Sequence, residues 1–298
     1  MRVLVATDGS SGARAAVDWL ARSFPGAGAT VTVVSVVAGP PAVAGGEAER
    51  LRAVATSVAE RAVGEARAAL SARWPEADGR VLDGDPREEL ARLAEAERAD
   101  LLVVGAAGLG GVRRFLLGSV SRAMVRHAPC PVLVVKGSAA RTETTIVAVD
   151  GSSHALEAVR YFAALGLELA GGVLVLGVVE PVRWPRAKPV ALSAQVRQAA
   201  RELGERRRSE MQEAVAQAAA ELRERATPVE TVLSEGRPAQ KIVETARKRG
   251  AGLVVVGARG VGTMMRLVLG SVSEAVLNDA PCPVLVVRAK RATTGGVP

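Results

Sequence analysis

The chain has 298 residues, which suits about two domains of ordinary size. Hydrophobic residues make up 49% of the sequence and aromatic residues only 2%, so Val, Leu and Ala must fill the cores. The apolar runs fall short of the ~18 residues that a membrane span needs. The formal charge of +8 comes without a basic helix, a finger motif or paired aromatics for base stacking. We therefore expect neither membrane nor nucleic-acid binding, and the lack of a signal-peptide pattern predicts a cytoplasmic protein.

The first half alternates short β-branched runs with amphipathic helices. Strands are expected at Val3–Ala6, Val31–Val37, Val81–Leu82, Leu101–Val104 and Val132–Val135. The helix after the first strand has an apolar stripe with helical spacing, formed by Val17, Leu20, Ala21 and Phe24. Trp19 falls on the polar side of this helix, where it would serve an interface. A long helix, about Glu47–Arg73, follows the second strand.

The second half repeats this pattern and parts of the sequence itself. VLVATDGSS at Val3–Ser11 returns as IVAVDGSS at Ile146–Ser153, and APCPVLVV occurs once in each half. Strands are expected at Ile146–Val149, Val173–Val179, Val229–Val232, Leu253–Val256 and Val284–Val287. Strands alternating with helices predict an α/β fold with a parallel sheet covered on both faces, and right-handed crossovers favour a doubly wound order. We predict two tandem Rossmann-like or flavodoxin-like domains, residues 1–138 and 143–298, each with a five-stranded parallel sheet.

The two copies differ in length. Asp8 and Asp150 lie 142 residues apart, whereas Gly105 and Gly257 lie 152 apart, so the second copy has about ten extra residues before Gly236. The basic, proline-containing stretch Pro181–Leu192 is the best candidate for the insertion. It would act as a partner or lid segment over the second site, or else form a solvated loop.

A glycine-rich motif follows the fourth strand of each half. Its residues are Gly105, Gly108, Gly118 and Ser119 in the first half, and Gly257, Gly260, Gly270 and Ser271 in the second. Glycine lets a ligand approach the backbone closely, and successive N–H groups in such a turn bind anions. We expect Ser119 and Ser271 to be helix N-caps, and a helix N-terminus attracts phosphate. Glycines that only make tight turns are the alternative, but the recurrence of the motif in the same frame argues against it.

With these residues the chain resembles the universal stress protein family over nearly its whole length. The resemblance is carried by the first-strand Asp, by the G-x-x-G-x9-G-S motif in both halves and by the closing CPVLVV strand. It implies the adenine nucleotide alpha hydrolase-like form of the fold, ATP binding with Mg²⁺ accompanying the phosphates, pairing of the domains through the last strand, and a role in stress or dormancy responses.

The resemblance also assigns a nucleotide site to each half. Phosphates would lie on Gly105, Gly108, Gly118, Ser119, Val120 and Ser121, and on Gly257, Arg259, Gly260, Gly270, Ser271, Val272 and Ser273. Ser121 and Ser273 would donate their hydroxyl groups. The backbone near Val36 and Val178 would hold adenine. The carboxylates of Asp8 and Asp150 would face ribose, adenine or a metal-bound phosphate.

One departure from the family pattern separates the two sites. Family members often carry a basic residue or His just before the second motif glycine, and the second half has Arg259 there while the first has Ala107. A shielded charge-assisted hydrogen bond is worth roughly 1.5–3 kcal/mol. We therefore expect the first site to bind ATP more weakly than the second, by about tenfold or more.

Other motifs give no sign of catalysis. The G-x-x-x-x-G-K-[ST] pattern is absent and neither motif loop contains Lys, so we expect no catalytic residue, no protein metal site and no enzyme. The best interpretation is an ATP-binding stress-response regulator or sensor that forms a homodimer, with its protein partner unknown. A slow ATPase or phosphotransferase is one alternative, and a scaffold for AMP, a cyclic nucleotide or nucleic acid is another. Cys130 and Cys282 are expected to be buried thiols, and Arg206–Arg208 the solvated face of a helix.

Overall fold

The computed structural model describes residues 1–39, 46–106, 117–136, 144–167, 171–181, 194–224, 228–260 and 269–288. The elements of the first half are β1 (Arg2–Ala6), α1 (Ser11–Ser23), β2 (Thr30–Val37), α2 (Gly46–Leu70), β3 (Asp78–Asp83), α3 (Pro86–Ala96), β4 (Leu101–Gly105), α4 (Ser119–His127) and β5 (Val132–Val135). Those of the second half are β6 (Thr145–Val149), α5 (Ser153–Leu165), β7 (Val173–Val179), α6 (Ala194–Arg223), β8 (Val229–Glu235), α7 (Pro238–Arg249), β9 (Leu253–Gly257), α8 (Ser271–Asp279) and β10 (Val284–Val287).

The strands of the described residues form one ten-stranded sheet, in the order β3-β2-β1-β4-β5-β10-β9-β6-β7-β8. Pairing within each half is parallel, as predicted, and each half has the doubly wound order. The order reverses between β1 and β4 in the first half and between β6 and β9 in the second. Open sheets of this kind bind ligands at the carboxyl ends of the strands beside such a reversal.

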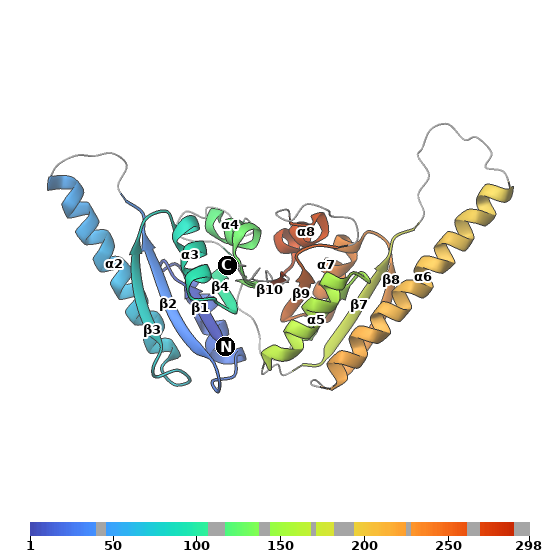
Figure 1. Ribbon diagram of the computed structural model, residues 1–298, viewed down its shortest axis with the longest axis horizontal. Helices are drawn as coiled ribbons and strands as arrows, with labels where there is room; N and C mark the ends of the chain where they lie inside the picture. The colour runs from blue at the N-terminus through green and yellow to red at the C-terminus, as the bar shows by residue number, and fades with distance from the viewer. Residues whose placement is uncertain are drawn as a thin grey trace, which may run out of the picture.

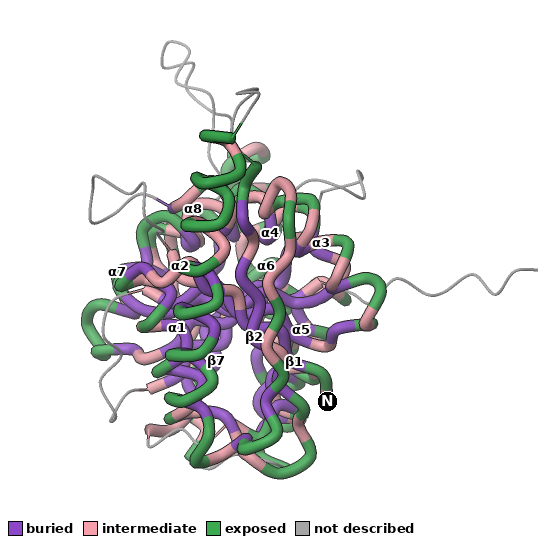
Figure 2. Tube along the Cα trace, turned by 90° about the vertical axis from the view of Figure 1, so that its left-hand side faces the viewer, coloured by how far each residue is buried: buried purple, intermediate pink, exposed green. Residues whose placement is uncertain are grey.

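Helices cover both faces of the sheet, and each face has one continuous apolar core that spans both halves. The core on one face includes residues of α1, α2, α5 and α6, and the core on the other includes residues of α3, α4, α7 and α8. The long helices α2 and α6 flank the molecule at its two outer sides (Figure 1). Their upper ends extend past the sheet and are largely exposed (Figure 2).

The two halves join through β5 and β10, the one antiparallel pair of the described sheet. Leu285 lies opposite Leu133, next to the local two-fold axis. Residues directly after these strands cross the joint. Lys136 donates from Nζ to Asn278 O at the end of α8 (3.0 Å), and Arg288 donates to Val125 O and Arg126 O at the end of α4 (2.8 and 2.6 Å). Each half therefore places a cation on the negative end of a helix in the other half.

A serine side chain caps the start of the helix that follows the first strand of each half. Ser10 caps α1 by accepting from Ala13 N, and Ser152 caps α5 by accepting from Ala155 N. The predicted apolar stripe of α1 is buried, apart from Ala21, which is half-buried. The placement of Trp19 was wrong: its side chain is only 3% exposed and belongs to the core. The covered surface of α1 is broader than one stripe, because both the sheet and α2 pack on it.

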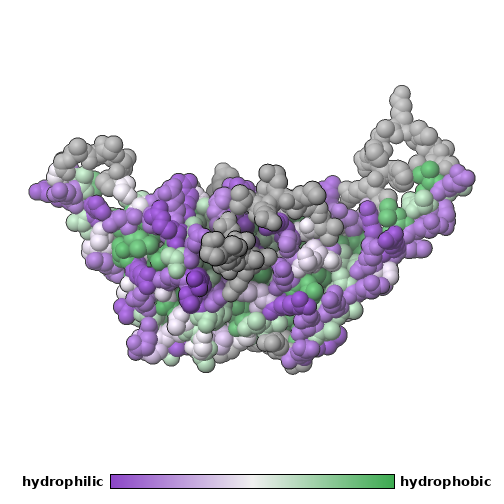
Figure 3. Space-filling model, viewed as in Figure 1, coloured by the Kyte–Doolittle hydropathy of each residue, from purple (hydrophilic) through white to green (hydrophobic). Residues whose placement is uncertain are grey.

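The surface is mainly hydrophilic on the face shown in Figure 3, with smaller hydrophobic areas between charged residues. Among the residues that the structure describes, no helix combines the length and apolar character that crossing a bilayer requires. Cys130 and Cys282 are buried thiols, as expected, and neither forms a disulfide.

Candidate functional site

A cavity of about 890 Å³ opens in the second half at the carboxyl ends of β6, β7 and β9. It lies at the reversal of strand order, between residues of α6 on one side and the first turns of α7 and α8 on the other. Its lining includes nine predicted site residues: Asp150, Val178, Gly257, Arg259, Gly260, Gly270, Ser271, Val272 and Ser273. The fold thus brings together residues that are up to 123 positions apart (150 to 273).

Asp150 occupies the end of β6 and is held by its own turn. Its Oδ1 accepts hydrogen bonds from Ser152 N (3.0 Å) and Ser152 Oγ (2.6 Å). Its other carboxylate oxygen, Oδ2, lies where a Cβ on Gly260 would have to stand. Only glycine lets the motif loop come this close to the carboxylate, so the second motif glycine has a packing reason that goes beyond turn formation.

The motif leads from the end of β9 to the start of α8. Gly270 is the N-cap, with φ −63° and ψ 145°, and no side chain caps the helix. The assignment of Ser271 as N-cap was wrong, and so was that of Ser119, because Gly118 caps α4 in the same way. The serines are instead the first helical residues. With no side chain over them, the first N–H groups of each helix are left to a ligand or to solvent.

Ser121 and Ser273 lie in the first turns of α4 and α8 and use their hydroxyl groups within the protein. Ser273 Oγ donates to Gly257 O (2.6 Å) and Ser121 Oγ donates to Gly105 O (2.5 Å). Both side chains are buried, and each ties the helix start to the strand end that precedes the motif. Their predicted donation to phosphate would require these bonds to be exchanged.

The adenine end is formed by the last residues of the second strand. Val178 is buried at the end of β7 and lines the cavity, followed by the exposed Glu180 at its rim. Val36 occupies the same place in β2, because its pairing with β3 matches the pairing of Val178 with β8.

The first half has the same framework. Asp8 follows β1 and accepts from Ser10 N (3.0 Å), Gly105 ends β4, and Gly118 to Ser121 start α4. Val120 and Ser119 lie in the first turn of α4, as Val272 and Ser271 do in α8. Gly108 and Ala107 lie outside the described residues. Of the predicted Pro181–Leu192 insertion, the described residues include Pro181 alone.

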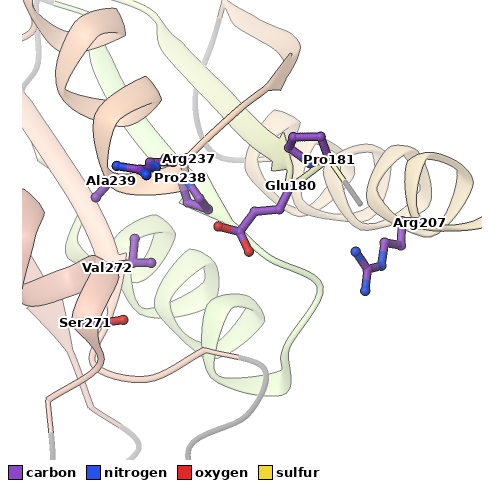
Figure 4. A pocket seen from close by; sticks show the side chains of 8 residues that line it. All are labelled: Glu180, Pro181, Arg207, Arg237, Pro238, Ala239, Ser271 and Val272. Atoms are coloured by element: carbon purple, nitrogen blue, oxygen red, sulfur yellow. The ribbon is translucent and has the colours of Figure 1, made fainter. Parts of the chain in front are cut away.

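Sequence reasoning missed the contribution of α6 and α7 to the second site. A second cavity of about 360 Å³ adjoins the first and shares Glu180, Arg207, Pro238, Ser271 and Val272 with it. It is also lined by Pro181, Arg237 and Ala239 (Figure 4). Arg206, Arg207 and Arg208 are all exposed on α6, as expected. Arg206 pairs with Glu210 and Arg208 with Glu235, whereas Arg207 also lines both cavities.

The repeat itself could have revealed this difference. Gly9 and Gly151 face Ala62 and Ala214, which sets α2 and α6 in register at a spacing of 152. At that spacing Ala55 corresponds to Arg207, and Asp85 to Arg237. The second site therefore has arginines where the first has an alanine and an aspartate.

Comparison with known proteins identifies the class. The model of the universal stress protein family matches residues 1–136 and 142–288. The chain therefore belongs to the universal stress protein family and contains two copies of its domain.

Individual relatives agree with this assignment. A universal stress protein of Mycobacterium tuberculosis is 36% identical over 202 residues, which cover 65% of this chain and 63% of the relative. One from Mycolicibacterium smegmatis is 29% identical over 309 residues, covering 96% of both chains. The chain thus matches about 63% of the length of the relative with the higher identity. A universal stress protein of Archaeoglobus fulgidus has the same fold, with a TM-score of 0.62 at 19% identity over 96% of this chain and 98% of that one.

Proposed function

We propose that the chain is an ATP-binding universal stress protein whose nucleotide occupancy regulates a stress response. The observation that carries the proposal is the gathering of nine motif-derived residues around one cavity of about 890 Å³ in the second half. A volume of this size is within the range of small-molecule and cofactor sites. Residues 1–138 and 143–298 are proposed as the two nucleotide-binding units.

The residues present fit a nucleotide. The start of α8 offers uncapped N–H groups, and the adjoining Arg259 lines the same cavity. Together they suit the phosphates. The glycines at 257, 260 and 270 line the cavity without side chains, so that a ligand can approach the backbone. At Gly260 a Cβ would also meet the carboxylate of Asp150. Apolar Val178 and Leu176 face the cavity from β7 and suit the base, while Asp150 suits ribose hydroxyls or Mg²⁺.

We propose binding without turnover. The residues that line this cavity include no Lys or His, and among the described residues no group of three or more His, Cys, Asp or Glu is placed to hold a metal. Mg²⁺ would therefore enter with the phosphates of ATP, and Asp150 is the carboxylate beside the glycine motif that suits it. We also propose a cytoplasmic protein that forms a homodimer.

Calorimetric titration with ATP and Mg²⁺ tests the proposal. We expect binding that Gly270→Val abolishes at the second site, because a side chain at the N-cap would block the approach of phosphate to α8. Gly204→Ala is the matched control, since Gly204 lies on α6 with no neighbour within 4 Å of a built Cβ. Absence of binding at millimolar ATP, or equal binding by Gly270→Val, would refute the proposal.

A further inference from the structure

The smaller cavity beside the second nucleotide site has a charge pattern that ATP binding at the glycine motif does not use. Arg207 reaches it from α6 and Arg237 from the loop before α7, with Ser271 on the third side. Figure 4 shows the carboxylate of Glu180 between the two arginine side chains in that view. Glu180 offsets one of the two positive charges, so these three side chains leave the cavity with a net positive charge.

Neither guanidinium is engaged elsewhere in the described part of the chain. The ion pairs of this region belong to Arg206 with Glu210 and to Arg208 with Glu235. The side chains of Arg207 and Arg237 have no hydrogen bond or ion pair among the described residues, and both residues are exposed. Two unpaired arginines on one cavity are suited to a phosphate group, which accepts several charge-assisted hydrogen bonds.

The first half has a carboxylate at the equivalent place. Asp85 precedes α3 there, and its Oδ1 accepts from Arg87 N (2.8 Å). The second half has Arg237 at that position, and no side chain caps α7. Ala239, which corresponds to Arg87, lines the smaller cavity, and the carboxylate that accepts from Arg87 N in the first half has no counterpart at position 237. The protein thus supplies its own anion in one half and a cation in the other.

Resting on the proposed function, we infer that the second site binds nucleotides carrying a further phosphate group, which enters the smaller cavity and contacts Arg207 and Arg237. Such a group is either the distal end of the 5′-phosphate chain or a phosphate on the ribose. The two cavities adjoin at Ser271 and Val272, which line both, and the inferred ligand spans them from the glycine motif to the two arginines. The first site lacks this selectivity because Ala55 and Asp85 take the place of the arginines.

Calorimetric titration of the full chain with AMP, ATP and adenosine 3′,5′-bisphosphate tests the inference. Arg207→Gln and Arg237→Asp should each weaken binding of the ligand whose extra phosphate enters the cavity by about tenfold, the scale of one charge-assisted hydrogen bond. AMP affinity should change less than twofold. Loss for ATP identifies the phosphate chain, and loss for the bisphosphate identifies a ribose phosphate.

Two controls separate this effect from misfolding. Arg201→Gln removes an exposed arginine of α6 that lines neither cavity, and it should leave every affinity unchanged. Arg237→Asp installs the cap of the first half, so its thermal midpoint should not fall. If neither arginine variant changes the affinity for ATP or the bisphosphate relative to AMP, the inference is refuted while the proposed function stands. If no nucleotide binds to the unaltered chain, both fail.

Discussion

The two halves share a backbone plan but differ in the chemistry they present at the carboxyl ends of their strands. In the second half, Arg207, Arg237 and Arg259 surround the proposed ligand region. The equivalent positions in the first half are Ala55, Asp85 and Ala107. The apolar positions in the strands stay the same between the copies, whereas these rim positions do not. The two copies thus share the residues that form the sheet, but they differ in charge at the positions around the proposed ligand region.

The largest expected difference in stability between the halves concerns the glycine that ends the fourth strand, Gly105 in the first half and Gly257 in the second. A Cβ on Gly105 would lie 2.5 Å from the C and O atoms of Gly12, whereas one on Gly257 would lie 3.1 Å from Arg259 O and 3.3 Å from His154 O. Gly105→Ala should lower the free energy of unfolding by about 3 kcal/mol, and Gly257→Ala by about 1 kcal/mol. Urea denaturation of both variants measures the difference, and equal losses would show that α1 moves away freely.

The two crossed helix contacts at the joint should differ in their pH dependence. Burial lowers the pKa of Lys136 from 10.5 to about 8, against the opposing charges of Cys282 and Asp279. A guanidinium, as at the other crossed contact, does not titrate in this pH range. Because the unfolded chain holds the Lys136 proton to higher pH, stability should rise as the pH passes 8. From pH 7 to 9.5 the unaltered chain should gain about 1–2 kcal/mol relative to Lys136→Met.

Urea denaturation across this pH range measures that gain. Lys136→Arg is the control, because its guanidinium does not titrate there and should give a flat difference. A relative loss of stability with rising pH would mean that the bonds to Asn278 O and Ala280 O hold the ammonium charged more strongly than burial opposes it.

The motif arginine should set the order of the two nucleotide affinities. Arg259→Ala should weaken ATP binding at the second site about tenfold, since a charge-assisted hydrogen bond to phosphate is lost. Ala107→Arg should strengthen the first site and bring the two closer. Calorimetric titration measures the dissociation constant of ATP at each site. Equal constants at the two sites of the unaltered chain would contradict this explanation.

The caps of α3 and α7 should give the smallest difference. A side-chain hydrogen bond with Arg87 lowers the pKa of Asp85 to about 2. Its contribution to stability should thus be complete above pH 3.8 and disappear as the pH falls through 2. Asp85→Ala should lower the thermal midpoint slightly at pH 7, and Arg237→Asp should raise it. Calorimetric scans at pH 7 and pH 2 check the sign, and a fall with Arg237→Asp would show that Arg237 stabilises the free protein.

The strands and their doubly wound arrangement could be predicted from the sequence. Short apolar runs such as Leu101–Val104, which alternate with amphipathic helices, are typical of parallel strands buried on both faces. That the motif residues of the second half lie around one cavity could also be predicted, since they follow strands whose carboxyl ends meet at one edge of the sheet. Trp19 was misplaced because periodicity describes one stripe and cannot show how many elements cover a helix. The N-caps of α4 and α8 were placed one residue too late, at Ser119 and Ser271, because a glycine N-cap carries no side-chain signal. Arg207 and Arg237 were missed because their role depends on which faces of α6 and α7 meet the sheet.

The joint between β5 and β10 has a consequence for how such a protein can evolve. Two separate copies of one chain would meet there as a symmetric dimer and would be bound to carry identical sites. Linking the copies covalently keeps them together at an effective concentration in the millimolar range. Each copy is then free to accumulate its own substitutions. One chain can therefore carry two sites of different chemistry at the edges of one continuous sheet.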